Sequence, residues 1–311
     1  MMSGIGVIFN PYAGKNKRNP GLEDALRDIL GDHGLFARTD NKDDLARAVR
    51  DFLEAEIDVL AISGGDGTLH QVISAMADAY GSRSLPQIAS LRCGTMNTVS
   101  NSVKLKGQST DIMRHIVETY AAGGQFGLFA QHTMKVNDRF GFLTGAGVIA
   151  RFLQVYYSAP KPGPVHAAGM VAQMIFSAVF RTGYNQRIFH PSRCRLTVDG
   201  RDLPQDEYLF VLACTVKELG LGFKPTPRAY EKPGRFHLFA GSMTPAELVP
   251  RVPALWLGRD IVHPKMYYNG IAAEMTIEPL EPIPWMIDGD VYGTDQPLRF
   301  SVGPTLSLIV S

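Results

Sequence analysis

The chain has 311 residues, a formal net charge of +1 and 3 cysteines. This length exceeds one typical domain, so two domains with buried cores are expected. The near-neutral charge predicts no nucleic-acid partner, and the scattered cysteines, which form no C-x-x-C pair, indicate reduced thiols in a cytoplasmic protein. The N-terminus lacks a signal-peptide pattern, and the most apolar helix candidate, residues 167–179, is too short to span a bilayer.

Short apolar runs alternate with amphipathic segments through residues 1–124. The runs predict strands, and the segments predict helices because their apolar residues recur at helical spacing. The predicted strands are residues 4–9, 34–39, 57–62 and 87–91, and the predicted helices are 22–30, 45–53, 69–80 and 109–121. This alternation indicates an α/β domain with a parallel sheet that helices cover on both faces.

The pattern changes after Gly123-Gly124, where we place the domain boundary. A hairpin is predicted from residues 129–136 and 139–144 around the turn Asn137-Asp138. Further strands are predicted at 193–198, 207–214, 235–240, 274–278 and 298–302, with helices at 167–180 and 245–257. Residues 125–311 are therefore predicted to form a β-rich domain, an antiparallel sandwich, whose extreme C-terminus is free to return to the first domain.

A glycine-rich turn, Ser63-Gly64-Gly65-Asp66-Gly67-Thr68, separates the strand at 57–62 from the helix at 69–80. Glycines allow close backbone approach, and the N-terminus of a helix favours an anion, so this turn is a candidate phosphate site. Thr68 is predicted to cap the helix. Asp66 fits such a site if a divalent cation, a sugar hydroxyl or the loop itself engages its carboxylate. The alternative is an ordinary tight turn with Asp66 as a cap, and His70 is expected to be a partly exposed side chain.

Polar clusters follow three of the four predicted strands of the first domain. They are Asn10-Pro11, Gly64-Gly65-Asp66 and Gly94-Thr95-Met96-Asn97. In parallel sheets, ligands bind beyond the carboxyl ends of the strands. The three clusters are therefore predicted to meet at one edge of the sheet.

With these motifs in this order, the chain resembles the diacylglycerol kinase catalytic-domain family, which includes bacterial lipid kinases and sphingosine kinases, and more distantly the NAD kinases. The second half continues the resemblance through glycine clusters and one acidic element. They are Gly145-Ala146-Gly147, Gly220-Leu221-Gly222-Phe223 with Pro225 and Pro227, and Asp288-Gly289-Asp290. The resemblance implies a nucleotide-binding α/β domain, a β-sandwich domain and an active site in the cleft between them.

The resemblance also implies a role for each matching residue. Gly64, Gly65, Asp66, Gly67 and Thr68 would hold the phosphates of ATP and surround Mg²⁺, while Asn10, Gly94, Thr95 and Asn97 would line the nucleotide pocket. Asp288 would be the general base toward the acceptor hydroxyl, and Asp66 and Asp290 would ligate Mg²⁺. This set suits phosphoryl transfer, which needs positioning and charge neutralisation more than covalent chemistry.

The implied protein is an ATP-dependent lipid kinase that works at the membrane surface, cytoplasmic and peripherally membrane-associated, and that can form a homodimer. It would phosphorylate a hydroxyl of a lipid such as diacylglycerol, although a sphingoid base, phosphatidylglycerol or a polyprenol would also fit. The hypothesis of a lipid entry groove places Tyr156, Tyr157, Met170 and Met174 at its wall. Lys15, Lys17 and Arg18 form either a solvated turn or a basic patch that steers ATP or touches anionic head groups.

Three residues depart from the family pattern. Thr98 replaces an acidic residue after Asn97, Gln71 replaces another after the phosphate loop, and Asp290 stands where a Glu is usual. Two other functions therefore stay open: an NAD kinase-like phosphotransferase on a soluble nucleotide, against which the Asn10-Pro11 turn argues, and a non-catalytic nucleotide- or lipid-binding sensor.

Overall fold

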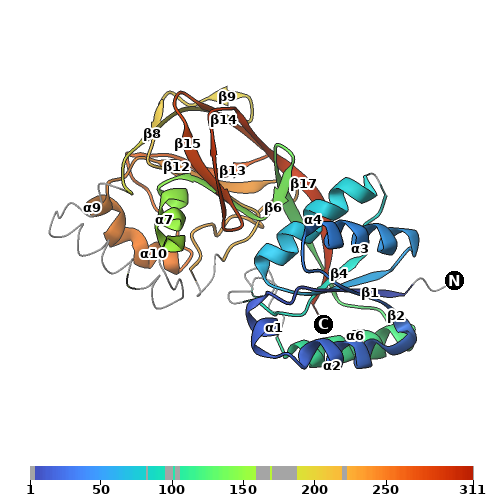
Figure 1. Ribbon diagram of the computed structural model, residues 1–311. Helices are drawn as coiled ribbons and strands as arrows, with labels where there is room; N and C mark the ends of the chain where they lie inside the picture. The colour runs from blue at the N-terminus through green and yellow to red at the C-terminus, as the bar shows by residue number, and fades with distance from the viewer. Residues whose placement is uncertain are drawn as a thin grey trace. The chain divides into compact units, whose positions relative to one another are not determined.

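The computed structural model describes residues 4–81, 83–94, 101, 106–158, 169, 188–218 and 223–310 (Figure 1). The chain divides into two compact units, unit 1 with Met1–Thr133 and Pro304–Ser311, and unit 2 with Met134–Gly303. The chain therefore passes between the units twice, and its last residues belong to unit 1.

A parallel sheet forms the centre of unit 1. Its strands follow the order β17, β4, β3, β1, β2, and all neighbours run parallel. They are β1 (Ile5–Phe9), β2 (Gly34–Arg38), β3 (Val59–Ser63), β4 (Gln87–Ser90) and the end of β17 (Leu298–Ile309). Every residue of β1 and β3 is buried, as expected for central strands with helices on both faces. The predicted parallel α/β fold is confirmed.

Amphipathic helices cover the two faces of this sheet. α2 (Leu22–Leu30) and α6 (Ser109–Ala121) pack together on one face, and α3 (Lys42–Glu54) and α4 (Asp66–Tyr80) on the other (Figure 1). Leu26, Met113 and Ile116 are fully buried against β1, β3 and β4. Two short helices complete the unit, α1 (Gly14–Arg18) after β1 and the 3-10 helix η1 (Gly31–His33) before β2.

Unit 2 is built from antiparallel strands in two layers. One layer follows the order β13, β12, β11, β7, β15, β16. These strands are β7 (Leu143–Gly147), β11 (Phe210–Cys214), β12 (Phe236–Gly241), β13 (Met266–Ala272), β15 (Ile283–Ile287) and β16 (Asp290–Thr294). The other layer holds the end of β5 (Leu128–Val136), β6 (Arg139–Gly141), β8 (Ser192–Val198), β9 (Arg201–Asp202), β10 (Glu207–Tyr208), β14 (Glu274–Pro279) and the start of β17.

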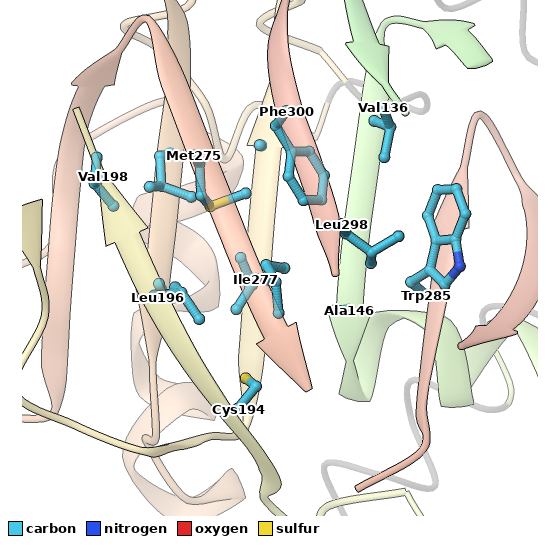
Figure 2. Close-up of a cluster of buried hydrophobic side chains, with 14 of the residues drawn as sticks. Val136, Ala146, Cys194, Leu196, Val198, Met275, Ile277, Trp285, Leu298 and Phe300 are labelled. Carbon is cyan, nitrogen blue, oxygen red and sulfur yellow. The ribbon is translucent and has the colours of Figure 1, made fainter. Parts of the chain in front are cut away.

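The main core of unit 2 lies between these two layers. Figure 2 shows Leu196, Met275, Ile277 and Phe300 from one layer with Trp285 from the other, all buried. Alternate residues of β8 are buried, as expected for a strand with one face on a core. The predicted antiparallel, β-rich character of this half is confirmed.

Helices cover the outer face of the β11 layer, and here the sequence prediction needs correction. The single helix predicted at 245–257 is divided into α9 (Pro245–Leu248), the 3-10 helix η3 (Val249–Arg251) and α10 (Val252–Trp256). Pro250 and Pro253 explain the division, because proline lacks an amide hydrogen and clashes with the preceding turn. α7 (Val148–Tyr157) and the strands β13, β15 and β16 were not predicted.

The helix predicted at 167–180 falls on residues that, apart from 169, lie outside the described ones. None of the helices in the described ranges has the length and apolar character needed to cross a bilayer.

Candidate functional site

Three loops that follow neighbouring strands come together in unit 1. The amide of Asn10 donates to the carbonyl of Ser63 at 3.0 Å, and the amide of Cys93 donates to the carbonyl of Gly64 at 3.0 Å. The amide of Lys15 donates to the carbonyl of Cys93 at 2.9 Å, so the segment after β1 is also hydrogen-bonded to the loop after β4. The predicted meeting of the polar clusters at the carboxyl edge of the sheet is confirmed for Asn10, Gly64 and Gly94. Thr95, Met96, Asn97 and Thr98 lie outside the described residues.

Asn10 links the end of β1 to the beginning of α4. Its Nδ2 donates to Thr68 Oγ1 at 2.8 Å, and its Oδ1 accepts from the amide of Tyr12 at 2.9 Å. The prediction that Thr68 caps the helix is wrong. The helix begins at Asp66 with Gly65 as its extended N-cap residue, so Thr68 lies inside the first turn and its hydroxyl accepts from Asn10 instead.

Asn16 on α1 is a site residue that the sequence did not reveal. It is only 3% exposed, and its Nδ2 donates to the carbonyl of Asn10 at 2.7 Å and to the carbonyl of Ser63 at 3.0 Å. One buried amide therefore fixes the first loop to the second. A lone asparagine in a turn cluster gives no sequence signal for this role, because its partners are backbone atoms.

A buried layer of small polar groups lies beneath the loops. The Cys93 Sγ lies 3.3 Å from Ser63 Oγ and 3.1 Å from Ser109 Oγ, and the Ser109 hydroxyl donates to the carbonyl of Leu91 at 2.7 Å. Ser63, Cys93 and Ser109 are all buried. This layer joins the loop after β4 to α6 and to the end of β3.

The glycines of the central motif differ in their surroundings. An ideal Cβ on Gly64 would lie 2.4 Å from Thr68 Cβ, and one on Gly65 would lie 2.8 Å from Gly94 Cα. Both positions therefore need glycine for packing within unit 1. Gly67, in contrast, has nothing within 4 Å of such a Cβ. It leaves bare backbone at the start of α4, where amides and the helix dipole favour an anion.

Asp66 and His70 occupy different environments on α4. Asp66 is the first residue of the helix and is half-buried, so its carboxylate stands at the same helix end as the bare backbone of Gly67. His70 is 4% exposed, and the expectation of a partly exposed side chain is wrong. The reason is the position of the helix start: His70 lies on the inward face of α4 with Leu69 and Ile73.

Asp288 lies in a two-residue turn between β15 and β16 of unit 2. Asp288 and Gly289 have φ values of +46° and +98°, and the flanking Ile287 and Asp290 are paired. This is the signature of a type I′ hairpin turn. The hairpin interpretation of Asp288-Gly289-Asp290 is therefore right for the backbone, but the carboxylate of Asp288 does more than close a turn.

The carboxylate of Asp288 is oriented by the loop between β6 and β7. Its Oδ1 accepts from the amides of Phe142 at 3.0 Å and Leu143 at 2.8 Å, and its own amide donates to the carbonyl of Leu143 at 2.8 Å. An ideal Cβ on Gly141 would lie 2.6 Å from Asp288 Oδ2 and 2.7 Å from Ile287 Cγ1, so a larger residue there would displace one of these side chains. Because a carboxylate can accept about four hydrogen bonds, these amide contacts leave room for a further donor.

Two tyrosines, Tyr157 and Tyr292, lie near the next carboxylate, that of exposed Asp290. Burial raises the pKa of Tyr157, and the nearby charge of Asp290 raises it further. The pKa of Tyr292 is raised by burial and by Asp290 in the same way. Arg139 stacks on the ring of Tyr292 at 4.2 Å from its centroid and donates to its hydroxyl at 3.1 Å. Asp290 is thus a negative charge near two phenols, one of which also contacts the guanidinium of Arg139.

The candidate metal ligands are divided between the units, Asp66 in unit 1 and Asp290 in unit 2. No group of three His, Cys, Asp or Glu side chains that could hold a metal ion occurs among the described residues.

Residues 4–125 match the sequence model of the family described as "Diacylglycerol kinase catalytic domain". Two relatives match over most of the chain, both named diacylglycerol kinase. The protein from Staphylococcus carnosus (strain TM300) is 26% identical over 309 residues, covering 94% of this chain and 90% of its own. The one from Staphylococcus aureus (strain bovine RF122 / ET3-1) is 25% identical over 306 residues, covering 94% of this chain and 88% of its own.

Solved structures share the fold of the entire chain. A crystal structure of a diacylglycerol kinase from Bacillus anthracis str. Sterne superposes with a TM-score of 0.68 at 16% identity, covering 99% of this chain and 97% of its own. A second structure from that organism reaches a TM-score of 0.74 at 18% identity with the same coverage. At these identities the structural likeness carries the fold alone.

Proposed function

Residues 4–125 belong to the diacylglycerol kinase catalytic-domain family, and on this premise we propose that the chain is an ATP- and Mg²⁺-dependent lipid kinase. The γ-phosphate of ATP would go to a hydroxyl of a membrane lipid such as diacylglycerol. The observation that carries the proposal is the cluster of loops after β1, β3 and β4. There Gly64 and Gly65 are required by packing, whereas Gly67 leaves open backbone at the beginning of α4.

The phosphates of ATP are assigned to the first turn of α4. A bare helix start offers amide donors and a favourable dipole to an anion. Gly67 has no packing reason to be glycine, and glycine in a helix costs roughly 0.5–1 kcal/mol relative to alanine. Close approach of a phosphate would account for this residue. Asn10 and Gly94 would contact the nucleotide from the two neighbouring loops, together with Thr95 and Asn97.

Mg²⁺ would be held by oxygen ligands that include the carboxylates of Asp66 and Asp290. The bound cation would neutralise charge on the phosphate oxygens, which is the main requirement of phosphoryl transfer. Asp66, at the start of α4, would otherwise repel a phosphate. A carboxylate at that position is therefore consistent with a metal-bound nucleotide.

Asp288 would accept the proton of the lipid hydroxyl. The amides of Phe142 and Leu143 hold its Oδ1 at 3.0 and 2.8 Å, which fixes the direction of the carboxylate before any substrate arrives. Such pre-orientation is valuable because general bases act only within hydrogen-bond reach of the proton that they accept.

The homodimer, for which β13 and β16 at the two ends of their sheet offer edges, stays a prediction.

The chain offers a matched control for Asp288. Asp199 and Gly200 form a second turn with φ values of +47° and +76°, between the paired residues Val198 and Arg201. The Asp199 carboxylate also accepts from two backbone amides, those of Ala273 at 2.8 Å and Glu274 at 3.0 Å. Asp199 therefore has the same kind of turn and amide contacts as Asp288, but it has no proposed part in phosphoryl transfer.

The test compares Asp288→Asn with Asp199→Asn in the full-length chain, supplied with ATP, Mg²⁺ and diacylglycerol in detergent micelles. Asparagine keeps the left-handed turn and the amide contacts but removes the base. We expect Asp288→Asn to lower kcat by about 10²-fold or more, while Asp199→Asn keeps wild-type turnover. Wild-type turnover by Asp288→Asn would refute its role as base. Phosphorylation of NAD in place of lipid, or ATP binding without turnover across a lipid panel, would replace the proposal with one of its two alternatives.

A further inference from the structure

The segment that contains α10 displays apolar side chains on the surface of unit 2. Trp256 is 45% exposed, Leu257 65% and Val262 92%. Single exposed apolar residues are ordinary, but three so close in the chain form a group that water solvates poorly. We call these three side chains, together with Lys224 and Arg259, the α10 patch.

The exposed side chains of the α10 patch belong to an ordered segment. Leu255, directly before Trp256, and Ile261, directly before Val262, are 5% and 6% exposed and anchor the segment in the core under the β11 layer. The Trp256 ring packs on Phe223 with centroids 5.6 Å apart. Gly258, at φ +68°, closes the helix by donating to the carbonyl of Leu255 at 3.1 Å. The apolar side chains are therefore held outward by the fold.

Positive charge flanks the apolar part of the patch. Arg259 follows the helix end directly and is exposed, and exposed Lys224 lies beside Gly258, whose ideal Cβ would be 3.4 Å from Lys224 Cβ. Within the described part of the chain, neither cation takes part in a salt bridge. Two other cations of this region are paired, Lys265 with Glu247 at 2.9 Å and Arg228 with Glu231 at 2.6 Å. Exposed Asp260 follows Arg259 directly, and its charge also acts on Arg228.

We propose that the α10 patch docks unit 2 on an anionic lipid bilayer. Trp256, Leu257 and Val262 would enter the interfacial layer, where aromatic and aliphatic side chains lose contact with water. Lys224 and Arg259 would meet the headgroup phosphates. The combination of a tryptophan, aliphatic tips and unpaired cations is typical of a surface that lies on a membrane. The inference rests on the proposed function, because a kinase that phosphorylates a bilayer lipid must reach its acceptor at such a surface.

The test measures flotation of the full-length chain with vesicles, without ATP. One set of vesicles contains phosphatidylcholine alone, and the other contains phosphatidylcholine with an equal amount of phosphatidylglycerol. Leu257→Asp combined with Val262→Asp should lower the bound fraction on anionic vesicles about tenfold, because two apolar tips no longer gain by leaving water. Lys224→Glu combined with Arg259→Glu should lower binding to the anionic vesicles and remove the preference for them.

Leu280→Asp is the matched control. Leu280 is 44% exposed in the same unit and lies between Glu278 and Glu281. These acids balance Arg193 and Arg195 on the neighbouring strand β8, so the site has apolar exposure without an excess of positive charge. The control should float like the wild type, and all variants should keep the thermal unfolding midpoint of the wild type. Wild-type flotation of the Leu257/Val262 variant would overturn the proposal. So would equal losses in that variant and in the control.

Turnover of diacylglycerol in detergent micelles separates this inference from the proposed function. If the variants with altered patches keep micellar turnover and lose only vesicle binding, the docking proposal is supported. A wild-type chain that turns over micellar lipid but does not float with anionic vesicles would overturn the docking and leave the kinase proposal standing. Flotation of a chain that transfers no phosphate would support the docking while refuting the kinase.

Discussion

Gly65 and Gly67 lie two positions apart in the glycine-rich turn at residues 63–68, but only Gly65 is explained by packing. An ideal Cβ on Gly65 would meet Gly94 Cα at 2.8 Å, and this neighbour is backbone that cannot swing aside. Gly67 has open space around it inside the first turn of α4. The two residues therefore separate the stability of the loop from its proposed contact with phosphate.

We expect Gly65→Ala to destabilise the chain by about 1–3 kcal/mol, since the loops after β3 and β4 must move apart. Gly67→Ala should instead raise the free energy of unfolding, by up to roughly 0.5–1 kcal/mol, because alanine favours the helix. Both variants should bind ATP more weakly, the second through the methyl group at the phosphate position. Urea unfolding and ATP-dependent thermal shifts measure the two effects. Unchanged ATP binding by Gly67→Ala would contradict the assignment of the phosphate to this turn.

At the scale of residues, the sequence predicts groups whose chemistry is local and misses groups whose partners are distant. Asp288-Gly289 carries its turn type in its own two residues. Asn16, in contrast, acts through carbonyls of Asn10 and Ser63, and the second of these lies 47 positions away. No pattern in the sequence around Asn16 predicts that contact. The carboxylate of Asp288 is likewise oriented by Phe142 and Leu143, which the turn itself cannot reveal.

Among the elements, α9 depends on a capping box between Thr244 and Glu247. Glu247 Oε2 accepts from the amide of Thr244 at 2.8 Å, and its Oε1 pairs with Lys265 Nζ at 2.9 Å. The hydrogen bond from Lys265, followed by those from Thr244, lowers the pKa of Glu247 from 4.5 to about 2. The ionised carboxylate is therefore favoured by the folded chain.

This pKa fixes a direction for the dependence of stability on pH. Because the folded pKa is below the unfolded one, the stabilising effect of Glu247 is complete above pH 4.5 and is lost as the pH falls toward 2. Glu247→Gln should accordingly be less stable than the wild type at neutral pH, and the difference should vanish near pH 2. Thermal unfolding midpoints between these limits measure it. In a Lys265→Met background the difference should be smaller, and an unaltered gap at pH 2 would contradict the assignment.

Element boundaries could be predicted where the local pattern was consistent. The helix predicted at 109–121 has those bounds in the structure, with buried Ile112, Met113 and Ile116 on one face. α9 and α10 show the opposite case, because an apolar segment containing two interior prolines has helical spacing but cannot form one helix. β15 was missed because Pro284 interrupts its apolar residues, although the residue lies within the strand.

At the scale of the whole molecule, the second passage of the chain between the units is the feature that local sequence patterns predict least. Residues 304–311 belong to unit 1, where Leu308 pairs with Ile88 of β4 and the amide of Val310 donates to the carbonyl of Gly127 at 2.9 Å. Along the end of β17, Leu306, Leu308 and Ile309 are buried while Thr305 and Ser307 are exposed. The last residues of the chain thus complete the sheet that carries the proposed nucleotide site.

Leu308→Asp should therefore impair ATP binding although it lies far along the chain from every residue assigned to the nucleotide. Leu308 is 5% exposed, so the variant loses a buried apolar side chain and places a carboxylate in a buried position. We expect a loss of more than about 3 kcal/mol in the free energy of unfolding. The loss should be accompanied by a weaker ATP-dependent thermal shift, because the loops after β3 and β4 rest on the strands that β17 supports.

Ser307→Asp is the matched control, since it introduces the same charge one residue earlier on the exposed side of the strand. Its stability should stay within about 0.5 kcal/mol of the wild type. Equal stability of the two variants would mean that the end of β17 is dispensable for unit 1. A destabilised Leu308→Asp chain with an unchanged ATP response would instead place the nucleotide on a part of the chain that does not depend on this sheet.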